Sequence, residues 1–135
     1  MRQIDQRLFK ILNVCFWVFV LIIFYLSVVK VQMIDNINKD KHGVRLDYIL
    51  HCLAYLFLVS FYKISQPNSG LLIIMRSPGF VFVIVMGIFS ELVQIYLPWR
   101  SFNFIDLFMN LAGILLGVIF VSSWDNIIKQ LKRAS

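Results

Sequence analysis

Charged residues are scarce in this 135-residue sequence, where they make up 15% of the chain while hydrophobic residues make up 60%. A soluble domain is usually about 25% charged and about 45–50% apolar. This composition excludes a soluble enzyme, a nucleic-acid-binding module and a disordered chain. The length allows about four membrane spans of ~20 residues with short loops. It leaves no room for a separate soluble catalytic domain.

Cysteine is also scarce, and the two cysteines are far apart in the sequence. Cys15 and Cys52 each lie inside an apolar run and form no zinc-type spacing. In neighbouring antiparallel spans they would lie at opposite membrane depths, too far apart for a disulfide. We interpret both as small buried hydrophobic residues. They therefore carry no information about the redox compartment.

The apolar residues fall into four runs, which are residues 11–29, 46–64, 79–97 and 104–124. The first run is too long for a signal peptide and no small-residue cleavage site follows it, so we expect an uncleaved span. Residues 31–45 predict a polar loop, residues 66–70 a turn, and residues 71–75 a short apolar segment at the membrane interface. The sequence predicts an all-α integral membrane bundle of four transmembrane helices, forming one domain over residues 1–135.

Lysine and arginine are distributed unequally between the two sides of this bundle. Four spans place both termini on one side, which holds eight of the 13 basic residues, and the other side holds five. The positive-inside rule therefore favours cytoplasmic termini. The net charge of +6 is explained by this flanking role, so no nucleic-acid partner is expected.

Ionisable and amide side chains interrupt the last three runs, where such residues commonly mark a functional site. They are Asp47, His51, Glu91, Gln94, Asp106 and Asn110. At 1.5 Å per residue, His51, Glu91 and Asn110 each lie roughly 7–9 Å inside the same side of the membrane. We therefore expect one polar layer in the outer leaflet, with Arg100 at its mouth in the short third loop.

Helical spacing turns these side chains toward the inside of the bundle. Asp47 and His51 are four residues apart and share a helix face. Asp106 and Asn110 form a stripe with Gly113, which begins a Gly-x-x-x-Gly pattern that lets another helix approach closely. The polar face of the fourth span is therefore expected to be its packing face.

Each of these residues also has a purely structural interpretation. Asp47 and Asp106 can be carboxylates in the first turn of a helix, with Asn103 as the N-cap of the fourth span. Asn110 and Gln94 can be interhelical hydrogen-bond partners. The structural and functional interpretations are compatible for Asp106.

The order of these motifs resembles the VanZ-like family of small bacterial membrane proteins. The matching elements are Asp-x-x-x-His-x-x-x-Tyr at 47–55, Ser-Glu-Leu-Val-Gln at 90–94, Arg-Ser-Phe at 100–102 and Asp-x-x-x-Asn-x-x-Gly at 106–113. Tyr48 departs from the family pattern, which commonly has Lys there, so an anion-binding role of that Lys would pass to Arg45 or be lost. The resemblance implies a multi-pass protein of the bacterial cytoplasmic membrane. The founding member of the family is associated with resistance to the glycopeptide antibiotic teicoplanin.

The first hypothesis for function is an envelope-facing pocket that binds, or binds and modifies, a cell-envelope or lipid-linked ligand. His51 and Glu91 are its catalytic candidates, because imidazole and carboxyl groups commonly transfer protons. The ligand-binding candidates are Asp47, Gln94, Arg100, Asp106 and Asn110. Glu91 is the residue least explained by structure alone, because it lies well inside the membrane.

Two other hypotheses stay open. Asp47, His51, Glu91 and Asp106 suit Mg²⁺, Mn²⁺ or Zn²⁺, although no dedicated metal spacing is present and no metal or cofactor is assigned. Alternatively, the polar layer only stabilises the bundle, and the protein is a non-catalytic membrane interaction or scaffold protein.

The expected partners are membrane lipids, a lipid-linked envelope precursor or a glycopeptide, and a second copy of the chain. No Ser or Cys is placed for activation by a paired histidine, which argues against a covalent acyl-transfer enzyme. The inner halves of the spans are almost wholly apolar, which disfavours a transporter.

Overall fold

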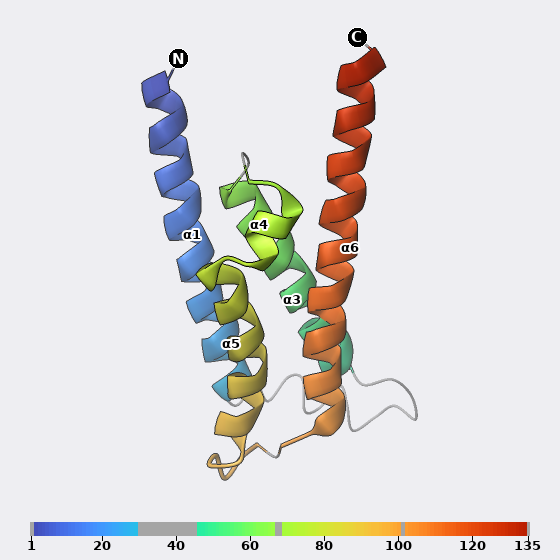
Figure 1. Cartoon of the computed structure of the whole chain (residues 1–135). Helices are drawn as coiled ribbons and strands as arrows, with labels where there is room; N and C mark the ends of the chain where they lie inside the picture. The colour runs from blue at the N-terminus through green and yellow to red at the C-terminus, as the bar shows by residue number, and fades with distance from the viewer. Residues whose placement is uncertain (1, 30–45, 67–68, 101, 135) are drawn as a thin grey trace.

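The structure is a computed structural model that describes the chain except for residues 1, 30–45, 67–68, 101 and 135. The described residues form five helices and no strand: α1 (Arg2–Val28), α3 (Leu46–Ser65), α4 (Leu71–Met75), α5 (Pro78–Gln94) and α6 (Phe104–Ala134) (Figure 1). The all-α prediction is confirmed for this part of the chain. The predicted loop at 31–45, with Arg45, lies outside it.

Three helices are long and apolar enough to cross a membrane, which indicates a membrane protein. They cover Arg7–Val28, Leu46–Ser65 and Phe104–Ile127. The fourth predicted span, 79–97, forms the shorter helix α5 of 17 residues. At 1.5 Å per residue its length is about 25 Å, below the ~30 Å hydrocarbon core. Three of the four predicted transmembrane helices are therefore long enough to cross a membrane, and the count of four is not confirmed.

Local sequence explains where α5 begins and favours its end before Pro98. Ser77 is the N-cap of α5 and accepts a hydrogen bond from the Phe80 N–H, and Pro78 follows at the first helical position, where no N–H is needed. Turns follow Gln94, because the residue preceding Pro98 is disfavoured in helical conformation.

The N-cap of α6 is Asn103, as the sequence predicts. Its side-chain oxygen accepts a hydrogen bond from the Ile105 N–H at 3.0 Å, which satisfies one of the free donors in the first turn. Asp106 also lies in that first turn. A carboxylate is favourable there, since the helix dipole places partial positive charge at the N-terminus.

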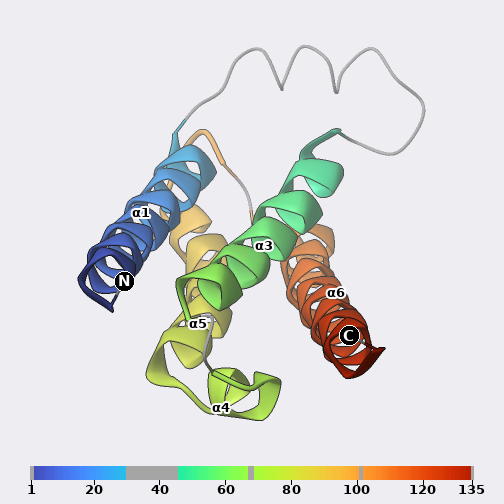
Figure 2. The ribbon, with the colours of Figure 1, turned by 90° about the horizontal axis from the view of Figure 1, so that it is seen from above.

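The helices alternate in direction, so the start of α1 and the end of α6 lie at the same end of the molecule (Figure 1). Seen from above, α3 lies between α1 and α6 (Figure 2). It packs against α1, α5 and α6. The residues in the first turns of α3 and α6 and in the last turns of α1 and α5 meet at the opposite end, where the predicted polar layer lies.

The closest packing in the bundle is between α3 and α6, at the glycines of the Gly-x-x-x-Gly pattern. A Cβ atom on Gly113 would collide with the backbone carbonyl of Cys52, and one on Gly117 would lie 2.8 Å from the Cβ of Val59. The predicted close approach is confirmed, and α3 is the helix that makes it.

The interpretation of Cys15 as a buried residue is wrong. Cys15 is exposed and Cys52 is half-buried, and both are free thiols. The reason is the narrow contact face of α1, which buries Phe16, Val20 and Ile23 at helical spacing. Cys15 precedes Phe16 by one residue and so points away from the bundle.

Candidate ligand-binding site

Asn110 of α6 is fully buried and joins α6 to two other helices. Its Nδ2 donates to the Gly87 carbonyl at 3.0 Å and to Glu91 Oε1 at 3.1 Å, both on α5. Its Oδ1 lies 2.8 Å from His51 Nδ1 on α3. Because Nδ2 faces two acceptors, the carbonyl oxygen of the amide faces the ring, and Nδ1 of His51 is the donor in this hydrogen bond. Asn110 thereby fixes the orientation of the imidazole.

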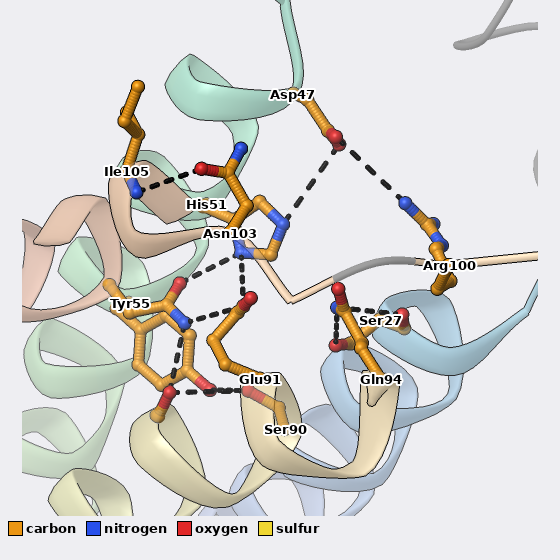
Figure 3. Close-up of polar contacts among 12 residues, drawn as sticks. Ser27, Asp47, His51, Tyr55, Ser90, Glu91, Gln94, Arg100, Asn103 and Ile105 are labelled. Carbon is orange, nitrogen blue, oxygen red and sulfur yellow. Dashed lines mark hydrogen bonds and ion pairs between the residues drawn. The ribbon is translucent and has the colours of Figure 1, made fainter. Parts of the chain in front are cut away.

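His51 lies between two carboxylates (Figure 3). Its Nδ1 is 3.5 Å from Glu91 Oε1, and its Nε2 is 3.9 Å from Asp47 Oδ1, one helical turn earlier on α3. The structure therefore brings together His51 and Glu91, the two residues that the sequence offers as catalytic candidates. An imidazole between two carboxylates can exchange protons with either side.

Glu91 is completely buried, with an exposed fraction of 0%. Its Oε1 accepts from Asn110, whereas its Oε2 has no hydrogen-bond partner in the part of the chain that the structure describes. A buried polar oxygen without a partner is costly. Glu91 is therefore the strongest indication in the bundle of a role beyond packing.

Asp106 joins the cluster from the first turn of α6. One carboxylate oxygen of Asp47, one of Asp106 and one ring nitrogen of His51 all lie within 4.8 Å of one another. Asp47 and Asp106 are both buried. The three residues come from two helices, so the packing of α3 against α6 sets their spacing.

Arg100 reaches the cluster from the loop between α5 and α6. One of its terminal nitrogens, Nη1, lies 3.9 Å from Asp47 Oδ2, and the other donates to the Val29 carbonyl at 3.1 Å. Trp99 donates its indole N–H to the Val28 carbonyl at 3.0 Å. Both side chains satisfy carbonyls at the end of α1, which a helix leaves without internal partners. Arg100 thus lies beside Asp47, at the mouth of the polar layer where its sequence position places it.

Gln94 points toward α1 instead of joining the cluster. Its Nε2 donates to the Ser27 carbonyl at 3.2 Å and to the Ser27 hydroxyl at 3.1 Å. It is buried and links α5 to α1. This contact is the interhelical hydrogen bond that the structural interpretation of Gln94 predicts.

A cavity of about 230 Å³ adjoins the cluster between α1, α3 and α5. Its polar lining residues are Ser27, Asp47, His51, Tyr55, Ser90 and Arg100, and its apolar ones are Ile23, Leu26, Leu50 and Ala54. Leu26 and Leu50 are 51% and 42% exposed, so the apolar side of the cavity reaches the outer surface of the bundle. The cavity therefore joins a polar end to an apolar, outward-facing side.

Ser27 and Ser90 line this cavity although they are not among the predicted site residues. Ser27 is a polar residue in the first apolar run, which is the signal that could have identified it. Ser90 precedes Glu91 and lies 3.4 Å from the Tyr55 hydroxyl, which faces the same cavity. A small hydroxyl residue in a span commonly serves only packing, so its sequence signal is weak.

Comparison with protein-family models, curated proteins and solved structures finds no match to this chain. The likeness to the VanZ-like family is a proposal that rests on the motif residues. The chemistry that the site can perform follows from its own side chains. It offers an imidazole and a buried carboxyl for proton exchange, carboxylates for a cation and a guanidinium for an anion.

Proposed function

We propose that this chain is a four-span membrane protein whose cavity binds an amphipathic, lipid-linked ligand of the cell envelope. The observation that carries the proposal is the composition of the cavity wall. Asp47, His51 and Arg100 form one part of the wall, and the exposed residues Leu26 and Leu50 form another. A ligand with a polar head and an apolar tail matches both parts at once.

Arg100 is the group that would hold the head of such a ligand. A guanidinium presents several N–H donors in a planar fork that fits phosphate and carboxylate oxygens. One terminal nitrogen is held by the Val29 carbonyl, which fixes the position of the side chain at the cavity. The apolar tail would leave the cavity past Leu26 and Leu50 into the surrounding lipid.

The proposed topology makes α5 the fourth span and places the cavity in the outer leaflet. A short span is accommodated by local thinning of the bilayer at modest cost. The common position of the start of α1 and the end of α6 (Figure 1) supports an even number of crossings. With cytoplasmic termini, the cavity faces the envelope. The VanZ-like resemblance adds the bacterial cytoplasmic membrane and a glycopeptide or envelope precursor as the ligand class.

His51 and Glu91 are the proposed groups for modifying the bound ligand. His51 faces the cavity, and Glu91 lies behind it on the other side of the ring. A proton taken from the ligand by the imidazole can therefore be balanced by the carboxylate behind it. Asn110 holds the ring in the orientation that this exchange requires.

The test uses the purified chain in nanodiscs that contain equal amounts of phosphatidylglycerol and phosphatidylcholine. Native mass spectrometry of the released protein counts the lipids that remain bound. We expect preferential retention of phosphatidylglycerol, and Arg100→Gln should abolish the preference. Arg76→Gln is the matched control, because Arg76 is exposed near the start of α5. An equal loss in both variants, or no preference in the wild type, contradicts the proposal.

The second candidate is a non-catalytic scaffold in which the polar groups only hold the bundle together. The observation that favours it is that two side-chain amides form hydrogen bonds with other groups of the protein. Asn110 makes three contacts within the bundle, and Gln94 makes two to Ser27. This candidate gives no reason for the cavity or for the buried oxygen of Glu91.

A further inference from the structure

We propose that Asp47, His51 and Asp106 bind one divalent transition-metal ion at the edge of the cavity. One ligand atom from each residue lies within 4.8 Å of the other two. A single ion can contact all three atoms after small side-chain adjustments, because metal–ligand distances are about 2 Å. All three ligands belong to the protein, so the metal site does not depend on which molecule fills the cavity. An ion on Nε2 uses the lone pair that would take a proton from a bound ligand, so metal binding and that proton transfer are alternative roles of His51.

The tautomer of His51 points to a ligand at Nε2. Asn110 Oδ1 is an acceptor 2.8 Å from Nδ1, so Nδ1 carries a proton and the neutral ring has its lone pair on Nε2. That nitrogen lies 3.9 Å from a carboxylate oxygen of Asp47. Two electron-rich atoms at this distance are brought together favourably by a cation between them. Metal-binding histidines usually donate their other N–H to an oxygen, as His51 does.

Glu91 supplies an independent observation. It is completely buried, points toward His51 (Figure 3) and has an oxygen, Oε2, that lacks a hydrogen-bond partner in the described part of the chain. Its carboxylate lies 3.5 Å from Nδ1, on the side of the ring opposite Nε2, and a carboxylate in that position orients the ring of a metal-binding histidine. Burial of several carboxylates together also becomes less costly when positive charge accompanies them. Arg100 brings one positive charge to the cluster, and the ion would bring two more.

The donor set indicates which ions fit. One imidazole and two carboxylates suit Mn²⁺ and Zn²⁺, whereas Ca²⁺ and Mg²⁺ prefer oxygen ligands alone. Three protein ligands leave at least one coordination position open. Asp47 and His51 line the cavity, so the open position faces it and can be taken by water or by an anionic group.

The test measures Mn²⁺ binding to the untagged full chain in detergent micelles by electron paramagnetic resonance. We expect one bound ion per chain, with a nitrogen coupling from the directly bound His51. Zn²⁺ should displace the Mn²⁺, so that the nitrogen-coupled signal disappears and the signal of free aqueous Mn²⁺ grows. Asp106→Asn should weaken the affinity at least tenfold, since even outer partners of metal ligands change it by about 10–100-fold.

Asp125→Asn is the matched control for Asp106→Asn. It makes the same change on the same helix about 28 Å away, where Asp125 pairs with Lys63 at 3.0 Å. Its Mn²⁺ affinity should equal that of the wild type. Equal affinities of the two variants overturn the proposal, and so does a wild-type signal without nitrogen coupling. The nitrogen coupling is measured on the wild type, so that test does not depend on the folding of any variant. Lipid retention is measured separately, so failure here leaves the proposed lipid ligand standing.

Discussion

Asn110 uses both ends of its amide inside the bundle, donating to Gly87 and Glu91 and accepting from His51. Replacement by leucine keeps the size of the side chain but leaves its partners buried without hydrogen bonds. Each lost partner costs about 1–3 kcal/mol. We therefore expect Asn110→Leu to lower the thermal unfolding midpoint in detergent clearly. Asn13→Leu, at an exposed position on α1, should leave it unchanged, and an equal effect of both would contradict this role of Asn110.

Glu91→Gln distinguishes a site from a purely structural polar layer. Glutamine keeps the shape and the acceptor for Asn110 but removes the charge. We expect unchanged abundance and a cooperative unfolding transition like that of the wild type, because the acceptor for Asn110 is kept. Mn²⁺ affinity should fall about 10–100-fold, as for other outer partners of a metal ligand. Unchanged affinity with unchanged stability would make Glu91 a hydrogen-bond partner of Asn110 and nothing more.

Helical periodicity was sufficient to predict which residues of α3, α5 and α6 meet. Asp47, His51, Glu91, Asp106 and Asn110 share inward faces at one depth, and the structure brings them together. The hydrogen-bond partners of Gln94 and Arg100 were not predictable in this way. Both side chains bind the end of α1, and the position of that end cannot be inferred from residue spacing within α5 or the third loop.

At the scale of the helices, contact between α3 and α6 depends on the absence of side chains at two positions. Gly113→Ala would place a methyl group against the Cys52 carbonyl, and overpacking of this kind typically costs about 1–3 kcal/mol. We expect a lower unfolding midpoint and weaker Mn²⁺ binding, because the same contact sets the distance between His51 and Asp106. Gly70→Ala is the control, since a Cβ there meets nothing within 4 Å. Equal stability of the two variants would show that the contact between α3 and α6 at Gly113 does not determine the stability of the bundle.

Helix α5 shows what hydropathy alone does not predict. The apolar run continues to residue 97, but the helix ends at Gln94. The following turns bring Trp99 and Arg100 to the carbonyls at the end of α1. Those contacts join distant segments of the chain, and together with the local effect of Pro98 they end the helix within the apolar run. The same turns place Arg100 at the cavity, so the short helix is part of the site.

At the scale of the whole molecule, the start of α1 and the end of α6 lie at one end, and the starts of α3 and α6 lie toward the other (Figure 1). Asp47 and Asp106 of the polar cluster are in the first turns of those two helices. The distribution of Lys and Arg predicts that the termini are cytoplasmic. A reporter active only in the cytoplasm should therefore be active after residue 135 and inactive within residues 36–41. The opposite pattern would move the cavity to the cytoplasmic leaflet and contradict an envelope ligand.

The central claim is that the cavity holds a ligand, and filling the cavity tests it most directly. Ala54 lines the cavity, so Ala54→Phe should occupy its volume, whereas Leu53→Phe enlarges a neighbouring residue that is 42% exposed on the outside of α3. Native mass spectrometry of both variants from nanodiscs measures the retained phosphatidylglycerol, and the unfolding midpoint confirms that each is folded. The account predicts that Ala54→Phe loses the lipid and that Leu53→Phe retains it. Equal retention by the two folded variants would contradict the account.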